Sequence, residues 1–164
     1  MQLDLSALPG ASGNGYMTSP THFLEVILEG KPSAVRAGLA HIRAELAALG
    51  ETENFLGRLE TVLAEVLNNI VEHAFKPGTN GEITIHLRKG RHDWHIRVDD
   101  TGNCMPNTAV PQGDLPSLVT DFYNLPEGGF GWALVKMLAN QVRYVRHEGG
   151  NRLEFLLPLV WDAE

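Results

Sequence analysis

Three polar side chains recur every four residues in one apolar segment of the chain. Glu65, Asn69 and His73 have the spacing that stacks side chains along one stripe of an α-helix. An amide oxygen suits Mg²⁺, which prefers hard oxygen ligands, and a carboxylate one turn earlier can orient or deprotonate an attacking hydroxyl. The pattern predicts either a magnesium site at Asn69 with Glu65 as a base, or a solvated polar stripe. His73 either joins that site or only packs at the helix end.

Two glycine motifs follow where regular structure is expected to end or to begin. Asp100-x-Gly102 comes after an alternating apolar segment. A carboxylate there can accept a hydrogen bond from the amine of adenine, and the glycine lets the backbone approach the base; a common Asp-x-Gly turn is the alternative. Gly129-x-Gly131 opens an apolar helix whose free amides can bind phosphate, although a glycine hinge has the same pattern. It is neither a P-loop nor a dinucleotide fingerprint, because Gly-Lys-Ser/Thr and a leading strand are both missing.

Apolar periodicity indicates the elements that must position these motifs. Helical spacing predicts helices near 31–49, 53–75 and 131–140, with Ser33 as an N-cap and Gly50 ending the first. Alternating or short apolar runs predict strands near 23–28, 83–87, 94–98, 142–146 and 152–157. Runs of strands packed on a few helices favour an α+β fold, a two-layer α/β sandwich with a mixed, mostly antiparallel sheet.

The length of 164 residues and a hydrophobic content of 43% predict one domain with a substantial core. Residues 1–20 contain many Gly, Ser, Asn and Pro residues, and we expect a flexible N-terminal tail followed by a single domain over 21–160. Residues 103–128 lack periodicity, and a long irregular segment of this kind is often a lid over a binding site. Within it, 115–123 is expected to form one short helix.

Composition excludes several classes of function. A formal net charge of -7 argues against direct nucleic-acid binding. The single Cys104 excludes an internal disulfide and a thiolate zinc cluster. No apolar run approaches the roughly 20 residues that span a bilayer, and the N-terminus lacks the pattern of a signal peptide. We therefore expect a cytoplasmic protein that does not enter a membrane.

Taken in order, the three motifs resemble the N, G1 and G2 boxes of the GHKL (histidine kinase-like) ATPase superfamily. Within it, the chain looks most similar to the anti-sigma factor serine-protein kinases, and residues 141–153 resemble the closing hairpin of that family. The resemblance covers roughly residues 23–157. It implies a histidine kinase-like ATPase fold with ATP and Mg²⁺ as cofactors.

The resemblance also implies a role for each matching position. Glu65 would be the catalytic base, Asn69 the magnesium ligand and Asp100 the adenine anchor. The other positions expected beside the nucleotide are His73, Gly102, Cys104, Gly129 and Gly131. The implied activity is transfer of the ATP γ-phosphate to a serine of an anti-anti-sigma (STAS-type) partner, and the implied second role is the binding and silencing of a sigma factor. The family also suggests a homodimer.

Two departures from the family pattern keep a second function open. Cys104 stands where the G1 loop usually has another glycine, and residues 107–135 contain no Lys or Arg to neutralise charge during phosphoryl transfer. A serine-protein kinase therefore competes with a non-catalytic, nucleotide-gated protein-binding module. A detached histidine-kinase ATP domain and a ligand-free structural domain are weaker alternatives, the first because no helical hairpin with a phosphoacceptor histidine precedes the domain.

Overall fold

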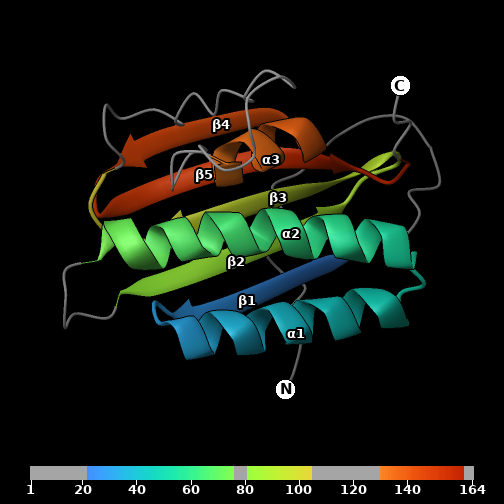
Figure 1. The fold of residues 1–164 in the computed structure, drawn as a ribbon, viewed down its shortest axis with the longest axis horizontal. Coiled ribbons are helices and arrows are strands. Elements are labelled where there is room, and N and C mark those ends of the chain that lie inside the picture. The colour runs from blue at the N-terminus through green and yellow to red at the C-terminus, as the bar shows by residue number, and fades with distance from the viewer. Residues whose placement is uncertain (1–21, 76–80, 105–129, 161–164) are drawn as a thin grey trace, which may run out of the picture.

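An antiparallel sheet with helices packed on one face forms the described part of the chain (Figure 1). The computed structural model describes residues 22–75, 81–104 and 130–160. Its sheet has five strands in the order β1-β2-β3-β5-β4, and all the described strand pairs are antiparallel. The strands are β1 Phe23–Glu29, β2 Glu82–Lys89, β3 Asp93–Asp100, β4 Asn140–His147 and β5 Gly150–Pro158. The expected α+β, two-layer sandwich is confirmed.

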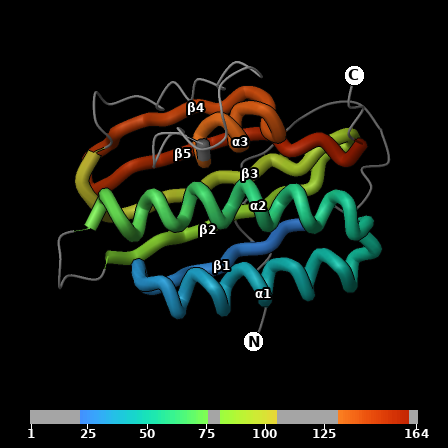
Figure 2. The backbone as a smooth tube through the Cα atoms, viewed as in Figure 1, coloured from blue at the N-terminus to red at the C-terminus, as the bar shows by residue number. Residues whose placement is uncertain are grey.

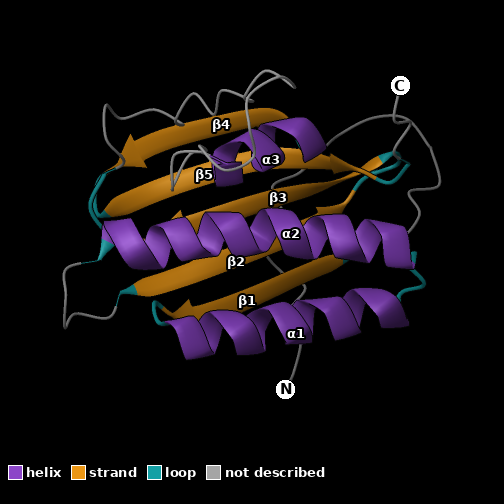
Figure 3. Ribbon diagram, in the orientation of Figure 1, coloured by secondary structure: helices purple, strands orange, loops and turns teal. Residues whose placement is uncertain are grey.

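The helices lie together over the sheet (Figure 3). They are α1 Pro32–Ala48, α2 Glu53–Asn69 and α3 Phe130–Leu138, and a short π-helix, η1 Ile70–Ala74, continues α2. The backbone trace shows α1 and α2 running side by side (Figure 2). No helix in the described ranges is long and apolar enough to cross a membrane. The expected tail at 1–20, the helix at 115–123 and nearly all of the lid lie outside the described residues.

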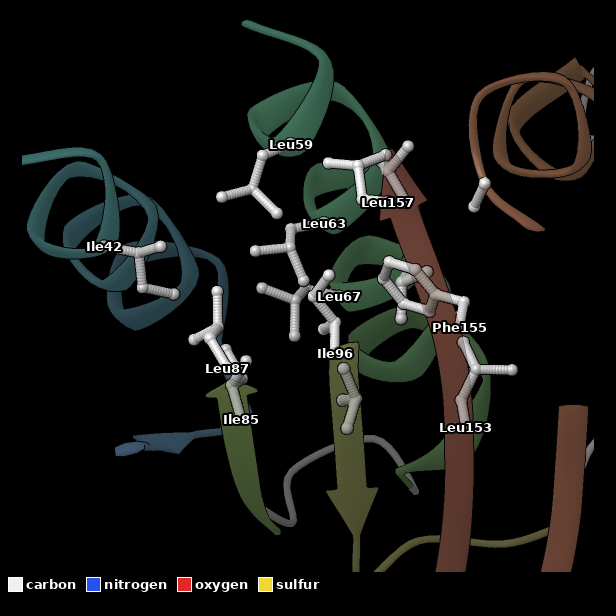
Figure 4. Close-up of a cluster of buried hydrophobic side chains, with 14 of the residues drawn as sticks. Ile42, Leu59, Leu63, Leu67, Ile85, Leu87, Ile96, Leu153, Phe155 and Leu157 are labelled. Carbon is white, nitrogen blue, oxygen red and sulfur yellow. The ribbon is translucent and has the colours of Figure 1, made fainter. Parts of the chain in front are cut away.

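Alternation in the strands directs one set of side chains to the helices. In β3, Trp94, Ile96 and Val98 are buried and the residues between them are half-buried. Because side chains alternate between faces, a slip of one residue would turn this apolar set away from the helices. The register pairs Ile96 with Phe155, so adjacent strands present apolar side chains to the same core (Figure 4).

The central helix α2 is the most firmly packed of the helices. Its buried residues include Val62, Leu63, Val66 and Leu67, each at most 1% exposed. Fully burying a side chain of this size stabilises the fold by about 1.5–3 kcal/mol. The polar side chains beside this apolar face therefore project from a rigid support.

The first helix begins differently from the prediction. Lys31 is its N-cap, makes no side-chain capping hydrogen bond, and is followed by Pro32 in the first turn, so the predicted N-cap Ser33 is wrong. Proline suits this position because its φ is already helical and its missing N–H would have no partner there. Gly50, with φ +84, follows the C-cap Leu49 and ends the helix as expected.

The end of α2 is anchored by an aromatic ring between two glycines. The predicted helix over 53–75 is α-helical only to Asn69 and then widens into η1. A Cβ added at Gly30 or at Gly81 would overlap the ring of Phe75. The amide of Gly30 also donates to the carbonyl of Gly81 over 2.7 Å. These contacts hold the helix end against the β1–α1 turn and the start of β2.

Candidate functional site

The second motif lies directly against the end of the first. A Cβ added at Gly102 would lie 2.6 Å from the Cβ of Ala74 and 2.7 Å from its carbonyl oxygen. The amide of Asn103 donates to that same carbonyl over 2.7 Å. Glycine is therefore required at position 102, because the loop after β3 passes too close to the helix end for any side chain.

The first motif also contacts the described part of the third. A Cβ added at Gly131 would overlap the carboxylate oxygen Oε2 of Glu65. Glu65 therefore lies over the first turn of α3, which begins at Phe130 and is held to the core by the buried Trp132 and Val135. The free amides of a helix N-terminus favour an anion. This end of the molecule thus brings a carboxylate and an anion-binding helix end together.

Asn69 presents an oxygen at the same place. Its Nδ2 donates to the backbone carbonyl of Glu65 over 2.6 Å. A carbonyl only accepts, so the carboxamide nitrogen must face it and Oδ1 must face away from the α2 backbone. In the described part of the chain, no residue donates a hydrogen bond to that oxygen. An amide oxygen in this position fits the preference of Mg²⁺ for hard ligands.

Asp100 is the buried acid of the site, only 7% exposed. Its Oδ1 accepts two hydrogen bonds of 2.8 Å, from the amide of Gly102 and from Nδ2 of Asn151. Burial raises the pKa of Asp100, while the hydrogen bonds from Asn151 and Gly102 and the charge of Arg146 oppose that rise. Because both donors use Oδ1, Oδ2 is the oxygen left to accept from a bound group.

A polar cluster on the β4–β5 hairpin supports Asp100 and was not predicted from the sequence. Tyr144 donates its hydroxyl to Oδ1 of Asn151 over 2.5 Å, and Arg146 donates to the same oxygen over 3.0 Å. Arg146 also donates to the carbonyl of Gly102 over 2.7 Å. The signal available in the sequence was a polar residue directly after a Gly-Gly turn, at the start of an alternation whose next members, Leu153, Phe155 and Leu157, are all apolar.

Two predicted site residues are not joined to the others. The side chain of His73 is 68% exposed and its Nε2 lies 3.9 Å from Glu72, while Cys104 is also exposed. Within the described ranges, no hydrogen bond or ion pair connects either residue to Glu65 or Asp100. For His73 the reason is local, because the π turn interrupts the four-residue spacing after Asn69. Gly129 lies outside the described residues.

The open face of the sheet carries a shallow hollow of about 430 Å³. It is lined by Phe23, Glu25, His86, Arg88, His95 and Arg97. These residues alternate with the core residues of β1, β2 and β3, so the hollow lies on the face away from α2. No residue of the three motifs contributes to it, and the candidate site is the one at the end of α2.

Residues 28–157 match the histidine kinase-like ATPase domain, and the chain belongs to this family. The match extends over the described core and all three motifs. The predicted fold class is thereby confirmed, and the domain type implies ATP binding.

Two relatives indicate a narrower group of proteins within this ATPase family. Over 137 residues the chain is 27% identical to the serine-protein kinase RsbW of Bacillus subtilis, covering 81% of this chain and 84% of RsbW. Over 89 residues it is 34% identical to the serine/threonine-protein kinase BtrW of Bordetella bronchiseptica, covering 54% of this chain and 61% of BtrW. The chain is thus a distant homologue of the RsbW and BtrW kinases over most of its length.

Among solved structures, the RsbU and RsbW domains of Rv1364c from Mycobacterium tuberculosis have a similar fold. The TM-score is 0.57 at 19% sequence identity, and the match covers 85% of this chain and 33% of that one. This likeness supports the fold alone.

Proposed function

We propose that the chain is an ATP-binding regulator of the anti-sigma factor type. In this proposal it is a magnesium-dependent serine-protein kinase that phosphorylates an anti-anti-sigma (STAS-type) partner and sequesters a sigma factor in the cytoplasm. The observation that carries the proposal is the contact between Glu65 and Gly131, because it places a carboxylate beside an anion-binding helix end. The kinase names of the relatives RsbW and BtrW support the reaction type.

In this proposal, different residues of the site bind the adenine base, the Mg²⁺ ion and the phosphates of ATP. Oδ2 of Asp100 would accept a hydrogen bond from the exocyclic amine of adenine, and Gly102, which has no side chain against Ala74, lets the loop that orients this carboxylate lie close to the helix end. Oδ1 of Asn69 would hold Mg²⁺, which when bound supplies positive charge to the phosphates. The α3 amides near Gly131, and the glycine at 129, would receive phosphate oxygens.

Glu65 acts on the partner protein. Its carboxylate accepts the proton of the serine hydroxyl as the oxygen of that serine attacks the terminal phosphorus, and ADP leaves. Its position at the N-terminus of α3 keeps it within reach of the phosphate end of the nucleotide. His73 and Cys104 remain expected contacts at the margin of the nucleotide rather than parts of this step.

The second candidate function is a non-catalytic module whose partner affinity depends on nucleotide occupancy. The observation that favours it is the absence of Lys and Arg from residues 107–135, which include most of the lid expected over 103–128. Transfer without a basic side chain there depends more heavily on metal and backbone amides. ATP binding is common to both functions, and phosphoryl transfer separates them.

A transfer assay tests the proposal. The purified chain is incubated with Mg²⁺, γ-labelled ATP and each purified STAS-type protein of the same organism, and labelled phosphoserine is sought by mass spectrometry. We expect transfer to at least one partner, and we expect Glu65→Gln to bind ATP normally without transferring phosphate. Glu60→Gln is the matched control, because Glu60 is an exposed carboxylate on the same helix and pairs with Arg43.

Binding of ATP without transfer to any STAS-type protein would support the non-catalytic module instead. Equal transfer by the wild type and Glu65→Gln would remove Glu65 as the base. Dimerisation is measured separately by light scattering of the purified chain with and without nucleotide, and sigma-factor binding by the same measurement after a purified sigma factor is added.

A further inference from the structure

The β4–β5 hairpin contributes a polar cluster to the adenine end of the site that none of the three motifs contains. We propose that Asn151 and Arg146 are positioning residues that keep the Asp100 carboxylate in an acceptor-only state, and so make the site select adenine over guanine. This inference rests on the proposed nucleotide site. It adds two residues that act through Asp100 and need not touch the nucleotide.

The first step of the argument is the orientation of the Asn151 side chain, which is only 3% exposed. Its Oδ1 lies 3.0 Å from a guanidinium nitrogen of Arg146, and a guanidinium group can only donate hydrogen bonds. The amide oxygen of Asn151 must therefore face the hairpin. Its Nδ2 then faces Oδ1 of Asp100 and the carbonyl of Asn103, each at 2.8 Å.

The second step is the effect on Asp100. Its Oδ1 receives the amide of Gly102 and Nδ2 of Asn151, which together fix the plane of the carboxylate. Arg146 ties the same loop to the hairpin through the carbonyl of Gly102. The loop and the hairpin thus both hold the carboxylate through Oδ1, and this fixes the direction in which Oδ2 points.

The third step concerns the base. Adenine carries an exocyclic amine, a donor, at the position where guanine carries a carbonyl oxygen, an acceptor. An ionised carboxylate only accepts, so it pairs with the amine and opposes the carbonyl, whereas a protonated acid can donate to that carbonyl. Discrimination between the two bases therefore depends on Asp100 being ionised.

The cation that favours ionisation of Asp100 lies on β4. Burial raises the pKa of Asp100 and the neighbouring Asp99 adds to that rise, while Asn151, Gly102 and Arg146 lower it. On the β2 side the paired residue is Ile83, which carries no charge. In the described part of the chain, Arg146 is the cation that acts on this carboxyl, and it is exposed enough to be replaced without disturbing the core.

The test uses three variants. Arg146→Met removes the charge and the hydrogen bonds, and Arg146→Lys keeps the charge. Arg143→Met is the matched control, because Arg143 is another exposed arginine of β4. The Asp100 carboxyl is titrated by ¹³C NMR in the nucleotide-free protein, and the affinities for ATP and for GTP are measured by calorimetry between mildly acidic and mildly alkaline pH.

We expect Arg146→Met to move the Asp100 titration to higher pH and to lower the ratio of ATP to GTP affinity. For each unit of that movement, ATP affinity at pH values below the wild-type midpoint falls about tenfold, because the ionised fraction falls tenfold there. Raising the pH restores both the affinity and the selectivity. Arg146→Lys keeps the Asp100 titration close to that of the wild type, because the positive charge remains, and Arg143→Met behaves like the wild type.

An unchanged Asp100 titration in Arg146→Met, or a loss of ATP affinity that is equal at every pH, would overturn the inference, since a merely structural role gives that result. Failure of the proposed function looks different. In that case the wild type binds neither nucleotide, while the NMR titration still reports whether Arg146 controls the ionisation of Asp100.

Discussion

Substitution of Gly102 by alanine tests the close approach on which the geometry of the site depends. The new Cβ would lie 2.6 Å from the Cβ of Ala74 and 2.7 Å from its carbonyl oxygen, against 3.4–4 Å for ordinary contact. Both atoms belong to the helix end, which the ring of Phe75 holds between two glycines, so neither can rotate away. The loop after β3 must move instead, and the hydrogen bond from Asn103 to Ala74 must lengthen or break.

The expected cost follows from these contacts. Overpacking costs about 1–3 kcal/mol, and the lost hydrogen bond costs about 1 kcal/mol. Alanine also restricts the unfolded chain, which returns about 0.4–1 kcal/mol. We therefore expect Gly102→Ala to lower the free energy of unfolding by about 1–3.6 kcal/mol, or to lower Tm by about 2–14 °C. ATP affinity should fall at least about tenfold, because the amide of Gly102 no longer orients Asp100.

Gly57→Ala is the matched control within the same domain. No atom lies within 4 Å of a Cβ added at Gly57, which stands inside α2. The same chemical change should here stabilise the protein by about 0.5–1 kcal/mol, because glycine is the poorer helix former. Urea denaturation and calorimetry measure both effects. Wild-type stability together with wild-type ATP affinity in Gly102→Ala would refute the close packing of loop and helix.

Three further outcomes are expected. Asn69→Ala should abolish the magnesium dependence of nucleotide binding while the circular dichroism spectrum stays unchanged. Equal ATP affinity of the wild type and Asn69→Ala in the presence of Mg²⁺ would contradict this prediction. Cys104 is exposed in the nucleotide-free protein and should react more slowly with thiol reagents when ATP is present; equal rates would place it away from the nucleotide. Burial, and then the charge of Arg97, lower the pKa of His86 in the folded protein. The stability that neutral His86 contributes is therefore present above the ordinary histidine pKa, and it is lost as the pH falls through the lower pKa of the folded state. The urea midpoint should accordingly fall more steeply under mildly acidic conditions in the wild type than in His86→Gln, with the exposed His41→Gln as the control, and parallel pH profiles would count against this coupling.

Much of the fold could be predicted because each strand buries one face. The alternation of Trp94, Ile96 and Val98 needs no tertiary information, and their burial follows directly from it. The N-cap at Ser33 was wrong because the preceding proline already suits the first turn of the helix. The π turn after Asn69 could not be predicted, because it accompanies an anchor of Phe75 against segments that are distant in sequence.

The candidate site, like the fold, could be predicted only in part. Spacing alone placed Glu65 and Asn69 on one helix, but it could not predict that Glu65 would meet Gly131, since that contact depends on how α3 packs on α2. Asn151 was missed because its role arises from cross-strand pairing with Asp100, which no local pattern encodes. Helical spacing also assigned His73 to the stripe of Glu65 and Asn69, but the π turn interrupts that spacing.

The most direct test of the central claim is calorimetric titration of ATP into the wild type and Asp100→Asn, with and without Mg²⁺. The amide is nearly isosteric with the carboxylate, but it is neutral and can place a donor where Oδ2 accepts from adenine. We predict magnesium-dependent binding by the wild type that is lost in Asp100→Asn, although both proteins are folded. Equal binding by the two proteins, or no binding by the wild type at millimolar ATP, would contradict a nucleotide site at the end of α2.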